Sequence, residues 1–367
     1  MQVSAERTYY MDSMRAALMM LVVVLHSAEI YTPSGHWGIH GENTSVIMVY
    51  VVSCINVFIM PAFFVVSGYF CYLMFKRYNV NEIVKVRIIR LIIPFITAAV
   101  TLNSIQVFIR SYAGWVKFDL LEYIIRGQYV SHLWFLIDLT IFFLAAAFVT
   151  AFLKKTALFI ADIISRIFLQ IPPVLVIILL PFTYICLLIL EKLGLPLTMN
   201  IYGVINMPRL CRYIPYFVFG ILLSYKPELL SRIRTGKTSC LLIIVVIAEA
   251  LLFRSLPLIN GPMWFIADAY DTHIRSWTGT VLCFYFFYKF MNKASEKTMF
   301  FSDASYTVYL FHHMFVSLFG LLCIHFGIST FLGVPAMIIV IFTLTLLIHK
   351  YFILKLPLMR YLFNGKK

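Results

Sequence analysis

The sequence predicts an all-α polytopic membrane helix bundle of about ten transmembrane helices, and three observations support this fold class. The first is composition, because 62% of the 367 residues are hydrophobic, 13% are charged and the mean hydropathy is +0.91. The second is that apolar runs long enough to span a bilayer recur along the chain. The polar gaps between them are too short to fold alone, so residues 1–367 are predicted to form one integral membrane domain.

The third observation is the distribution of Lys and Arg. With ten spans, 21 of the 30 Lys and Arg fall in the N-terminal tail, the even-numbered gaps and the C-terminal end, and 8 fall in the odd-numbered gaps. Both termini are therefore predicted to be cytoplasmic. The net charge of +14 is then a topology signal, which indicates anionic head groups of the lipid bilayer as a partner and argues against nucleic acid.

The predicted spans are connected by short loops. The fifth and sixth are the least well defined, because four prolines crowd that region and residues 156–170 also fit an amphipathic interfacial helix. The ten spans are residues 12–31, 47–75, 88–109, 132–153, 171–190, 210–225, 239–256, 276–292, 303–325 and 331–353.

The first span carries polar residues along one face. On a helix, Arg15 and His26 share a face to within about 20°, and Asp12 lies about 40° away on the same stripe. His26 lies about 16 Å deeper along the axis than Arg15. Ionisable residues at this depth usually face a bundle interior or a wet cavity, which makes this stripe a candidate functional site. The structural alternative is that Arg15 extends to the surface and His26 bonds a neighbouring carbonyl.

The first outer loop, residues 32–45, places His36, Trp37 and His40 at the outer surface together with Glu42. Its glycines argue against the helix that a metal-binding His pair at this spacing would need, so no metal site is predicted. Trp37 fits an interfacial anchor and also a platform on which a sugar ring could stack.

Further polar residues lie in or beside later spans. In the second span, Ser67 precedes Gly68, and these small residues permit either close helix approach or a local break. Arginines three residues apart at a membrane entry suit a polyphosphate, although positive-inside charge also explains them. The remaining candidates are Lys85, Arg87 and Arg90 at the third span, His132, Trp134 and Asp138 at the fourth, and His312 and His313 in the ninth.

These stretches together resemble the acyltransferase-3 family of integral membrane acyltransferases. YYMDSMRAALMMLVVVLH carries Asp12 and an Arg-x10-His signature formed by Arg15 and His26. Glu29 departs from the family pattern, where an apolar residue is expected, and residues 155–240 show no distinctive match. The other matching segments are FFVVSGYF (63–70), KVRIIRLIIPF (85–95), SHLWFL (131–136), ASYTVYLFHH (304–313) and ILKLPLMRYLFNGK (353–366).

The resemblance implies an enzyme of the bacterial inner membrane with a cytoplasmic acyl-CoA donor and an acceptor hydroxyl on the far side. Succinyl-CoA or acetyl-CoA would be the donor substrate, with no permanently bound cofactor, and the HLWF and YLFHH segments favour a branch that succinylates periplasmic glucans. The CoA phosphates would lie on Arg15, Arg87, Arg90 or Lys85. The separation of Arg15 and His26 is about the length of an extended pantetheine arm.

The resemblance also suggests how the residues divide the chemistry. Imidazole titrates near neutrality, so His26 is the preferred general base, and Glu29, one turn later, could orient it. Asp12 is expected to hold Arg15. Direct transfer in a ternary complex is preferred, and an acyl-histidine intermediate stays open. Candidates for the acceptor or oxyanion side are Trp37, Ser67, His132, Trp134, His312 and His313.

Three alternatives remain from the sequence. One is a proton-coupled transporter of an anionic solute, against which stands the absence of an internal repeat. Another is an O-acetyltransferase that acts on a different cell-surface polysaccharide. A purely structural scaffold explains the polar stripe poorly. A homo-oligomer is also open, since small residues such as Gly320 permit packing between subunits.

Overall fold

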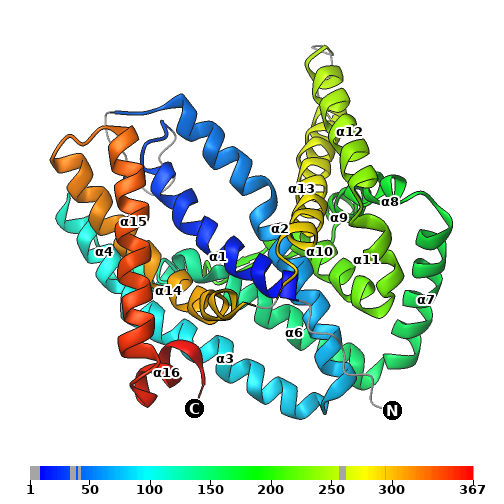
Figure 1. Ribbon diagram of the computed structural model, residues 1–367, viewed down its shortest axis with the longest axis horizontal. Coiled ribbons are helices and arrows are strands. Elements are labelled where there is room, and N and C mark those ends of the chain that lie inside the picture. The colour runs from blue at the N-terminus through cyan, green and yellow to red at the C-terminus, as the bar shows by residue number, and fades with distance from the viewer. Residues whose placement is uncertain (1–8, 34–38, 40–42, 256–261, 294, 367) are drawn as a thin grey trace.

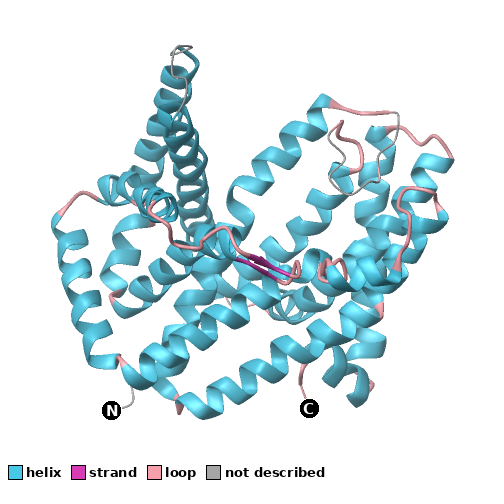
Figure 2. Cartoon of the chain, turned by 180° about the vertical axis from the view of Figure 1, so that it is seen from behind, coloured by secondary structure: helices cyan, strands magenta, loops and turns pink. Residues whose placement is uncertain are grey.

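The computed structural model describes residues 9–33, 39, 43–255, 262–293 and 295–366. Helices dominate the described chain, and its strands form one small antiparallel pair (Figure 2). The elements in chain order are α1 (Tyr9–Glu29), α2 (Val46–Arg77), α3 (Val80–Val100), α4 (Leu102–Tyr112), α5 (Leu120–Ile125), η1 (Ser131–Leu133), α6 (Trp134–Phe152), α7 (Lys154–Gln170), α8 (Pro173–Leu179), α9 (Pro181–Lys192), β1 (Asn200–Ile201), β2 (Ile205–Asn206), α10 (Met207–Tyr225), α11 (Pro227–Ile233), α12 (Gly236–Ser255), α13 (Pro262–Phe290), α14 (Glu296–His325), α15 (Thr330–Ile348), η2 (His349–Ile353) and α16 (Pro357–Asn364).

The protein is a multi-pass membrane protein. Within the described ranges, six segments are long and apolar enough to cross a bilayer. Large apolar side chains such as Phe108, Leu332 and Ile339 are well exposed on the helices, as a lipid-facing surface requires. The prediction of an all-α bundle is confirmed, and the finer prediction of ten spans stays a prediction. The six segments are Tyr9–Glu29, Val46–Arg77, Ser131–Phe152, Pro173–Lys192, Glu296–His325 and Thr330–Ile353.

Two of the predicted spans are not continuous helices. Residues 88–109 divide between α3 and α4 at Thr101, whose side-chain hydroxyl donates to the Thr97 carbonyl at 2.6 Å. Residues 171–190 divide between α8 and α9 at Leu180, because Pro181 has no backbone N–H to continue the helix. Residues 156–170 belong to a helix of their own, α7, most of which is exposed.

The helix α1 lies at the centre of the bundle and packs against α2, α13, α14 and α15 (Figure 1). The helix α2 in turn crosses α10 at a very close approach. A Cβ atom added to Gly68 would lie 2.0 Å from the Phe217 carbonyl oxygen, and one added to Gly220 would lie 2.0 Å from the Val65 carbonyl oxygen. Gly68 therefore provides close helix contact, which is one of the two alternatives that the sequence left open.

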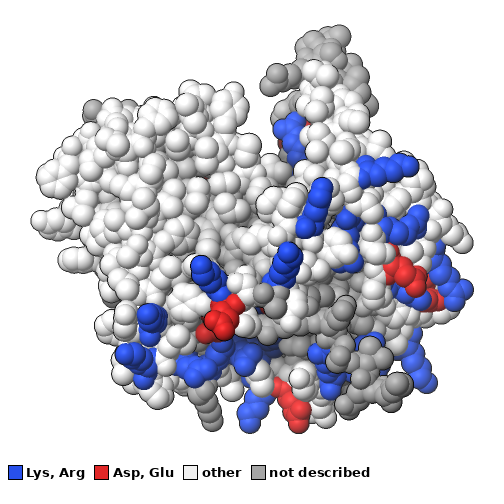
Figure 3. Space-filling model, in the orientation of Figure 1, with Lys and Arg blue, Asp and Glu red and all other residues white. Residues whose placement is uncertain are grey.

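Basic side chains are unevenly distributed over the face shown in Figure 3. Lys and Arg gather along the lower and right-hand parts of this face, whereas its upper left part, over α4 and the upper ends of α1 and α15, shows none. The placement of both termini in the cytoplasm stays a prediction. The helix α16 lies at the lower edge, on the basic side (Figure 1).

The charge predicted inside the fourth span is paired. Asp138 on α6 is fully buried, and its carboxylate accepts hydrogen bonds from Nε and Nη2 of Arg209 on α10 at 2.7 and 2.8 Å. The Arg209 guanidinium also lies 4.8 Å from the ring centroid of Trp134. A bidentate pair of this kind satisfies both ions away from water. Asp138 therefore faces the bundle and holds Arg209 against Trp134.

Candidate active site

Four histidines from three elements meet beside α1. His26 comes from α1, His132 from η1, and His312 and His313 from α14. The His26 ring stacks on that of His312, with centroids 5.4 Å apart, and meets His313 edge-on at 5.1 Å. His132 stacks on His313 at 4.5 Å. The packing of α14 on α1 therefore gathers imidazoles that are almost 290 residues apart in the sequence.

Two local features hold His132 in this group. Ser131 has a φ of 41°, in the left-handed region that non-glycine residues rarely adopt, and this places η1 at a sharp entry into α6. The buried hydroxyl of Tyr309 donates to the His132 carbonyl at 2.7 Å. Strained backbone of this kind persists where the surroundings hold it, often at functional sites.

Hydrogen bonds define which nitrogen of two imidazoles can accept a proton. Nδ1 of His26 lies 2.6 Å from Oε2 of Glu29, which is three residues later on the same helix face and only 7% exposed. With Nδ1–H donating to this carboxylate, Nε2 of His26 is the basic nitrogen. Nδ1–H of His312 donates to the Tyr309 carbonyl at 2.6 Å, so Nε2 of His312 likewise carries the lone pair.

A cavity of about 340 Å³, here called the histidine cavity, opens beside these rings. His26, His132 and His313 line it, whereas His312 is fully buried behind them. Its other polar or aromatic lining residues are Asn56, Arg110, Ser131, Trp134, Phe135 and Tyr309. Arg110, on α4, is the only Lys or Arg among the described residues of this lining.

A second cavity of about 350 Å³, here called the basic cavity, lies further toward the N-terminal end of α1. The Arg15 guanidinium donates to Ser302 Oγ at 2.9 Å and lies 3.3 Å from Asp12 Oδ1, while Lys366 pairs with Asp303. The cationic residues that line this cavity are Arg15, Arg87, Arg90 and Lys366.

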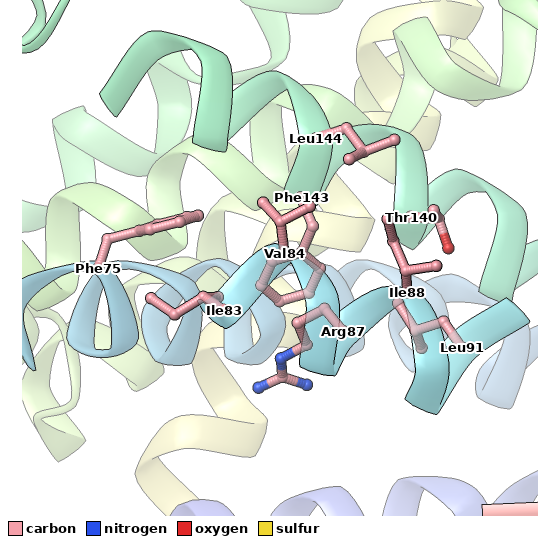
Figure 4. Close-up of a pocket in the computed structure, with 9 residues that line it drawn as sticks. All are labelled: Phe75, Ile83, Val84, Arg87, Ile88, Leu91, Thr140, Phe143 and Leu144. Atoms are coloured by element: carbon pink, nitrogen blue, oxygen red, sulfur yellow. The ribbon is translucent and has the colours of Figure 1, made fainter. Parts of the chain in front are cut away.

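Arg87 shows how this cavity keeps a charge next to apolar helices. Its stem packs among side chains of α3 and α6, and Figure 4 shows its guanidinium directed away from them. The guanidinium carbon lies 4.8 Å from the Phe143 ring centroid, and Nη2 lies 2.7 Å from Met74 Sδ. A cation–π contact and a soft sulfur acceptor hold the group in place, and among the residues that the structure describes no carboxylate forms an ion pair with it. Its charge is thus available to the cavity.

The two cavities meet at Phe135. This residue lines both of them and is itself only 4% exposed. On α1, Met19 lines the basic cavity and Val22, one turn later, lines the histidine cavity. Arg15 and His26 therefore face two chambers that follow one another along a single helix.

Several predicted residues lie elsewhere than expected. Ser67, expected on the acceptor side, lines the basic cavity together with Arg15, because the face of α2 that carries it turns toward α3 and α14. Lys85 is exposed and does not line either cavity, since it projects from the opposite side of α3 from Arg87. Trp37, with His36, His40 and Glu42, lies outside the described residues.

Sequence reasoning missed three lining residues. Arg110, Asn56 and Lys366 line the cavities and are not among the candidate residues named from the sequence. A polar residue such as Asn56 within a span was the one available signal. Among the described residues, no group of three His, Cys, Asp or Glu side chains is arranged to hold a metal ion.

A helical membrane bundle with a histidine cluster beside a chamber lined by arginines fits an integral membrane acyl-transfer enzyme. The family comparison agrees, because the profile described as an acyltransferase domain matches residues 8–350, and the chain belongs to this acyltransferase-3 family. The protein is a membrane acyltransferase.

Curated relatives extend over the whole chain. Glucans biosynthesis protein C of Escherichia coli K12 is 27% identical over 99% of this chain and 96% of its own length. The protein of the same name from Salmonella paratyphi B is 28% identical with the same coverage. No solved structure matches this chain.

Proposed function

We propose that this protein is an O-succinyltransferase of the bacterial inner membrane, which moves a succinyl group from cytoplasmic succinyl-CoA to hydroxyl groups of a periplasmic glucan. The acyltransferase family and the name of the relatives support the reaction class and the acceptor. The observation that carries the proposal is the pair of cavities that meet at Phe135, with cations in one and histidines in the other.

In this proposal the basic cavity binds the donor. The CoA phosphates lie on Arg15, Arg87 and Arg90, because guanidinium groups pair with phosphate through two hydrogen bonds. The pantetheine arm then runs along α1 past Phe135. Eleven residues of helix separate Arg15 from His26, or about 16 Å, which is the reach required to bring a thioester to the imidazole.

His26 acts as the general base in the histidine cavity. Its Nε2 takes the proton of the acceptor hydroxyl as the hydroxyl oxygen attacks the thioester carbonyl. The new ester C–O bond forms, the C–S bond breaks, and the CoA thiolate receives the proton from the imidazolium. Glu29 holds the ring and stabilises its charge through the 2.6 Å contact with Nδ1. Transfer is direct, with donor and acceptor bound together.

Arg110 supports succinyl as the acyl group. A succinyl thioester placed beside His26 carries a free carboxylate into the histidine cavity, and acetyl does not. Within the part of the chain that the structure describes, Arg110 is the only Lys or Arg that lines that cavity, and a guanidinium is the preferred partner of a carboxylate. His313, which lines the same cavity, is the nearest candidate to donate to the developing oxyanion.

A purified-protein assay tests the proposal. The protein in nanodiscs is incubated with a β-glucan and either succinyl-CoA or acetyl-CoA, and mass spectrometry reads the glucan. We expect a mass gain of one or more succinyl groups with the wild type and with His325→Ala, an exposed histidine at the end of α14 that lines neither cavity. His26→Ala should give none.

The other outcomes separate the alternatives. Acetylation of the glucan without succinylation would show that the donor is acetyl-CoA and not succinyl-CoA. CoA binding without any mass gain on the glucan would refute the acceptor. Movement of an unmodified anionic solute across the membrane of proteoliposomes, with no CoA binding, would indicate that the protein is a transporter.

A further inference from the structure

A third cavity of about 390 Å³ lies next to the histidine cavity and belongs to neither chamber described above. It is formed by α2, α10 and α13. Its lining is rich in polar side chains, namely Ser53, Asn56, Arg212, Asp271, Thr272, Arg275 and Ser276, with Tyr213, Tyr216 and His273 on its wall. We call it the α10–α13 cavity.

This cavity is joined to the histidine cavity by shared residues. Asn56 lines both of them. Trp134, which lines the histidine cavity, stacks on Tyr213, which lines the α10–α13 cavity, with ring centroids 5.6 Å apart and planes 17° from parallel. The two cavities are therefore adjacent, and the Asn56 amide and one aromatic pair lie between them.

The chemistry of the lining indicates a hydroxyl-rich ligand. Arg275 pairs with Asp271, so these two charges offset each other, and the Arg212 guanidinium is left to donate hydrogen bonds into the cavity. The wall is also pre-arranged, because the Tyr216 hydroxyl lies 3.0 Å from His273 Nδ1 and Ser276 Oγ donates to the Thr272 carbonyl at 3.0 Å. Amide, hydroxyl, carboxylate and guanidinium groups together offer both donors and acceptors, and a sugar hydroxyl uses both.

The aromatic rings of this region are not free to stack on a sugar. Trp134 is contacted by the Arg209 guanidinium at 4.8 Å and stacks on Tyr213, and Tyr213 also stacks on Phe64 at 4.8 Å. Tyr216 stacks on Trp277 at 4.0 Å. Recognition in this cavity must therefore come from hydrogen bonds rather than from stacking.

We propose that the α10–α13 cavity is a second acceptor subsite, which binds the sugar residue next to the one whose hydroxyl is acylated beside His26. This inference rests on the proposed function. It makes the enzyme select a chain of sugars over a single sugar, because only a chain fills both cavities. Arg212 contributes its guanidinium donors to the second sugar from a partly open position.

The test compares acceptors of two lengths. With succinyl-CoA saturating, KM is measured for a linear β-glucan hexasaccharide and for a methyl glucoside, using the wild type, Arg212→Gln and Thr272→Ala. We expect KM for the hexasaccharide to rise about tenfold in Arg212→Gln, the size typical of one lost hydrogen bond to a charged group. KM for the glucoside should stay the same. Arg126→Gln, an exposed arginine directly after α5 that lines none of the three cavities, is the matched control.

Equilibrium binding of both sugars without any donor separates the two proposals. Hexasaccharide binding that weakens in Arg212→Gln, with intact thermal stability, supports the subsite even if no acyl transfer is seen. Equal effects on both sugars, or no effect on either, would overturn the subsite and leave the acceptor class standing. Failure of the wild type to bind either sugar would overturn the subsite and the glucan acceptor together.

Discussion

The basic cavity and the histidine cavity are similar in size but opposite in chemistry. The basic cavity presents four cationic side chains and one carboxylate, and the Arg15 side chain at its wall is 41% exposed. In the histidine cavity His132, His313 and Tyr309 are buried and the His26 side chain is 17% exposed, and Arg110 is the only permanent cation among the described lining residues. Charges that bind a polyanion can stay hydrated, whereas a proton-transfer group works best where water is excluded. This difference supports the proposal that the basic cavity binds the donor and the histidine cavity carries the chemistry.

The comparison predicts the largest effect for His26. His26→Ala should lower kcat at least about a hundredfold, which is the lower end of what a positioned general base contributes, and leave the dissociation constant for CoA unchanged. Stopped-assay mass spectrometry and CoA titration would measure the two quantities. The His325→Ala protein should match the wild type in both quantities. A wild-type kcat in the His26→Ala protein would refute the proposal that the histidine cavity carries the chemistry.

Arg87 should behave in the opposite way. Arg87→Gln should raise KM for succinyl-CoA by about tenfold, as expected for the loss of a charged hydrogen bond, and change KM for the glucan little. Steady-state kinetics in both substrates would show the split. Arg77→Gln, an exposed arginine at the end of α2 outside both cavities, is the control. A larger effect on the glucan than on the donor would reverse the assignment of the basic cavity.

A substitution of Arg110 tests whether the histidine cavity also binds a charged group, the succinyl carboxylate. Arg110→Gln should lower the ratio of kcat/KM for succinyl-CoA to that for acetyl-CoA by about tenfold, since acetyl has no carboxylate to lose a partner. Competition between the two donors in one tube, read by glucan mass, gives this ratio directly. Equal losses with both donors would mean that Arg110 serves the reaction in general and does not read the acyl group.

Trp134 should give the smallest effect. Trp134→Phe weakens the cation–π contact that holds Arg209 beside the histidine cavity, and such contacts contribute about 0.5–1 kcal/mol. We expect KM for the glucan to rise about two- to fivefold while KM for succinyl-CoA stays constant. Trp264→Phe, on an exposed part of α13, controls for the loss of an indole. A change in KM for succinyl-CoA alone would mean that Trp134 affects donor binding and not glucan binding.

Much of the candidate site was predictable because it lies on regular helices. The stripe of Asp12, Arg15 and His26 follows from helical periodicity alone, and Glu29 falls one turn beyond His26 where it can bond the ring. The pair Arg87 and Arg90 likewise follows from a spacing of three. Helix packing brings Arg15 to the same cavity as Arg87 and Arg90, and it brings His26 to His313. No local sequence pattern contains this packing.

The errors have the same origin. Ser67 reaches the basic cavity and Lys85 points outward because the rotation of α2 and α3 about their axes is decided by neighbours. The break at Thr101 that directs α4 back toward α14, and so brings Arg110 to the histidines, carries no proline or glycine signal. Lys366 enters the basic cavity only because the C-terminal segment folds back onto α14.

The sequence by itself determined that this chain is a helical membrane protein and which face of α1 is polar, because hydropathy and helical periodicity are local properties. Tertiary structure alone decided that four histidines share one site, that the two chambers meet at Phe135, and that a polar third cavity adjoins them. The physical reason is that helix positions in a bundle depend on small residues such as Gly68 and Gly220 and on buried pairs such as Asp138 with Arg209. These act between segments distant in the chain.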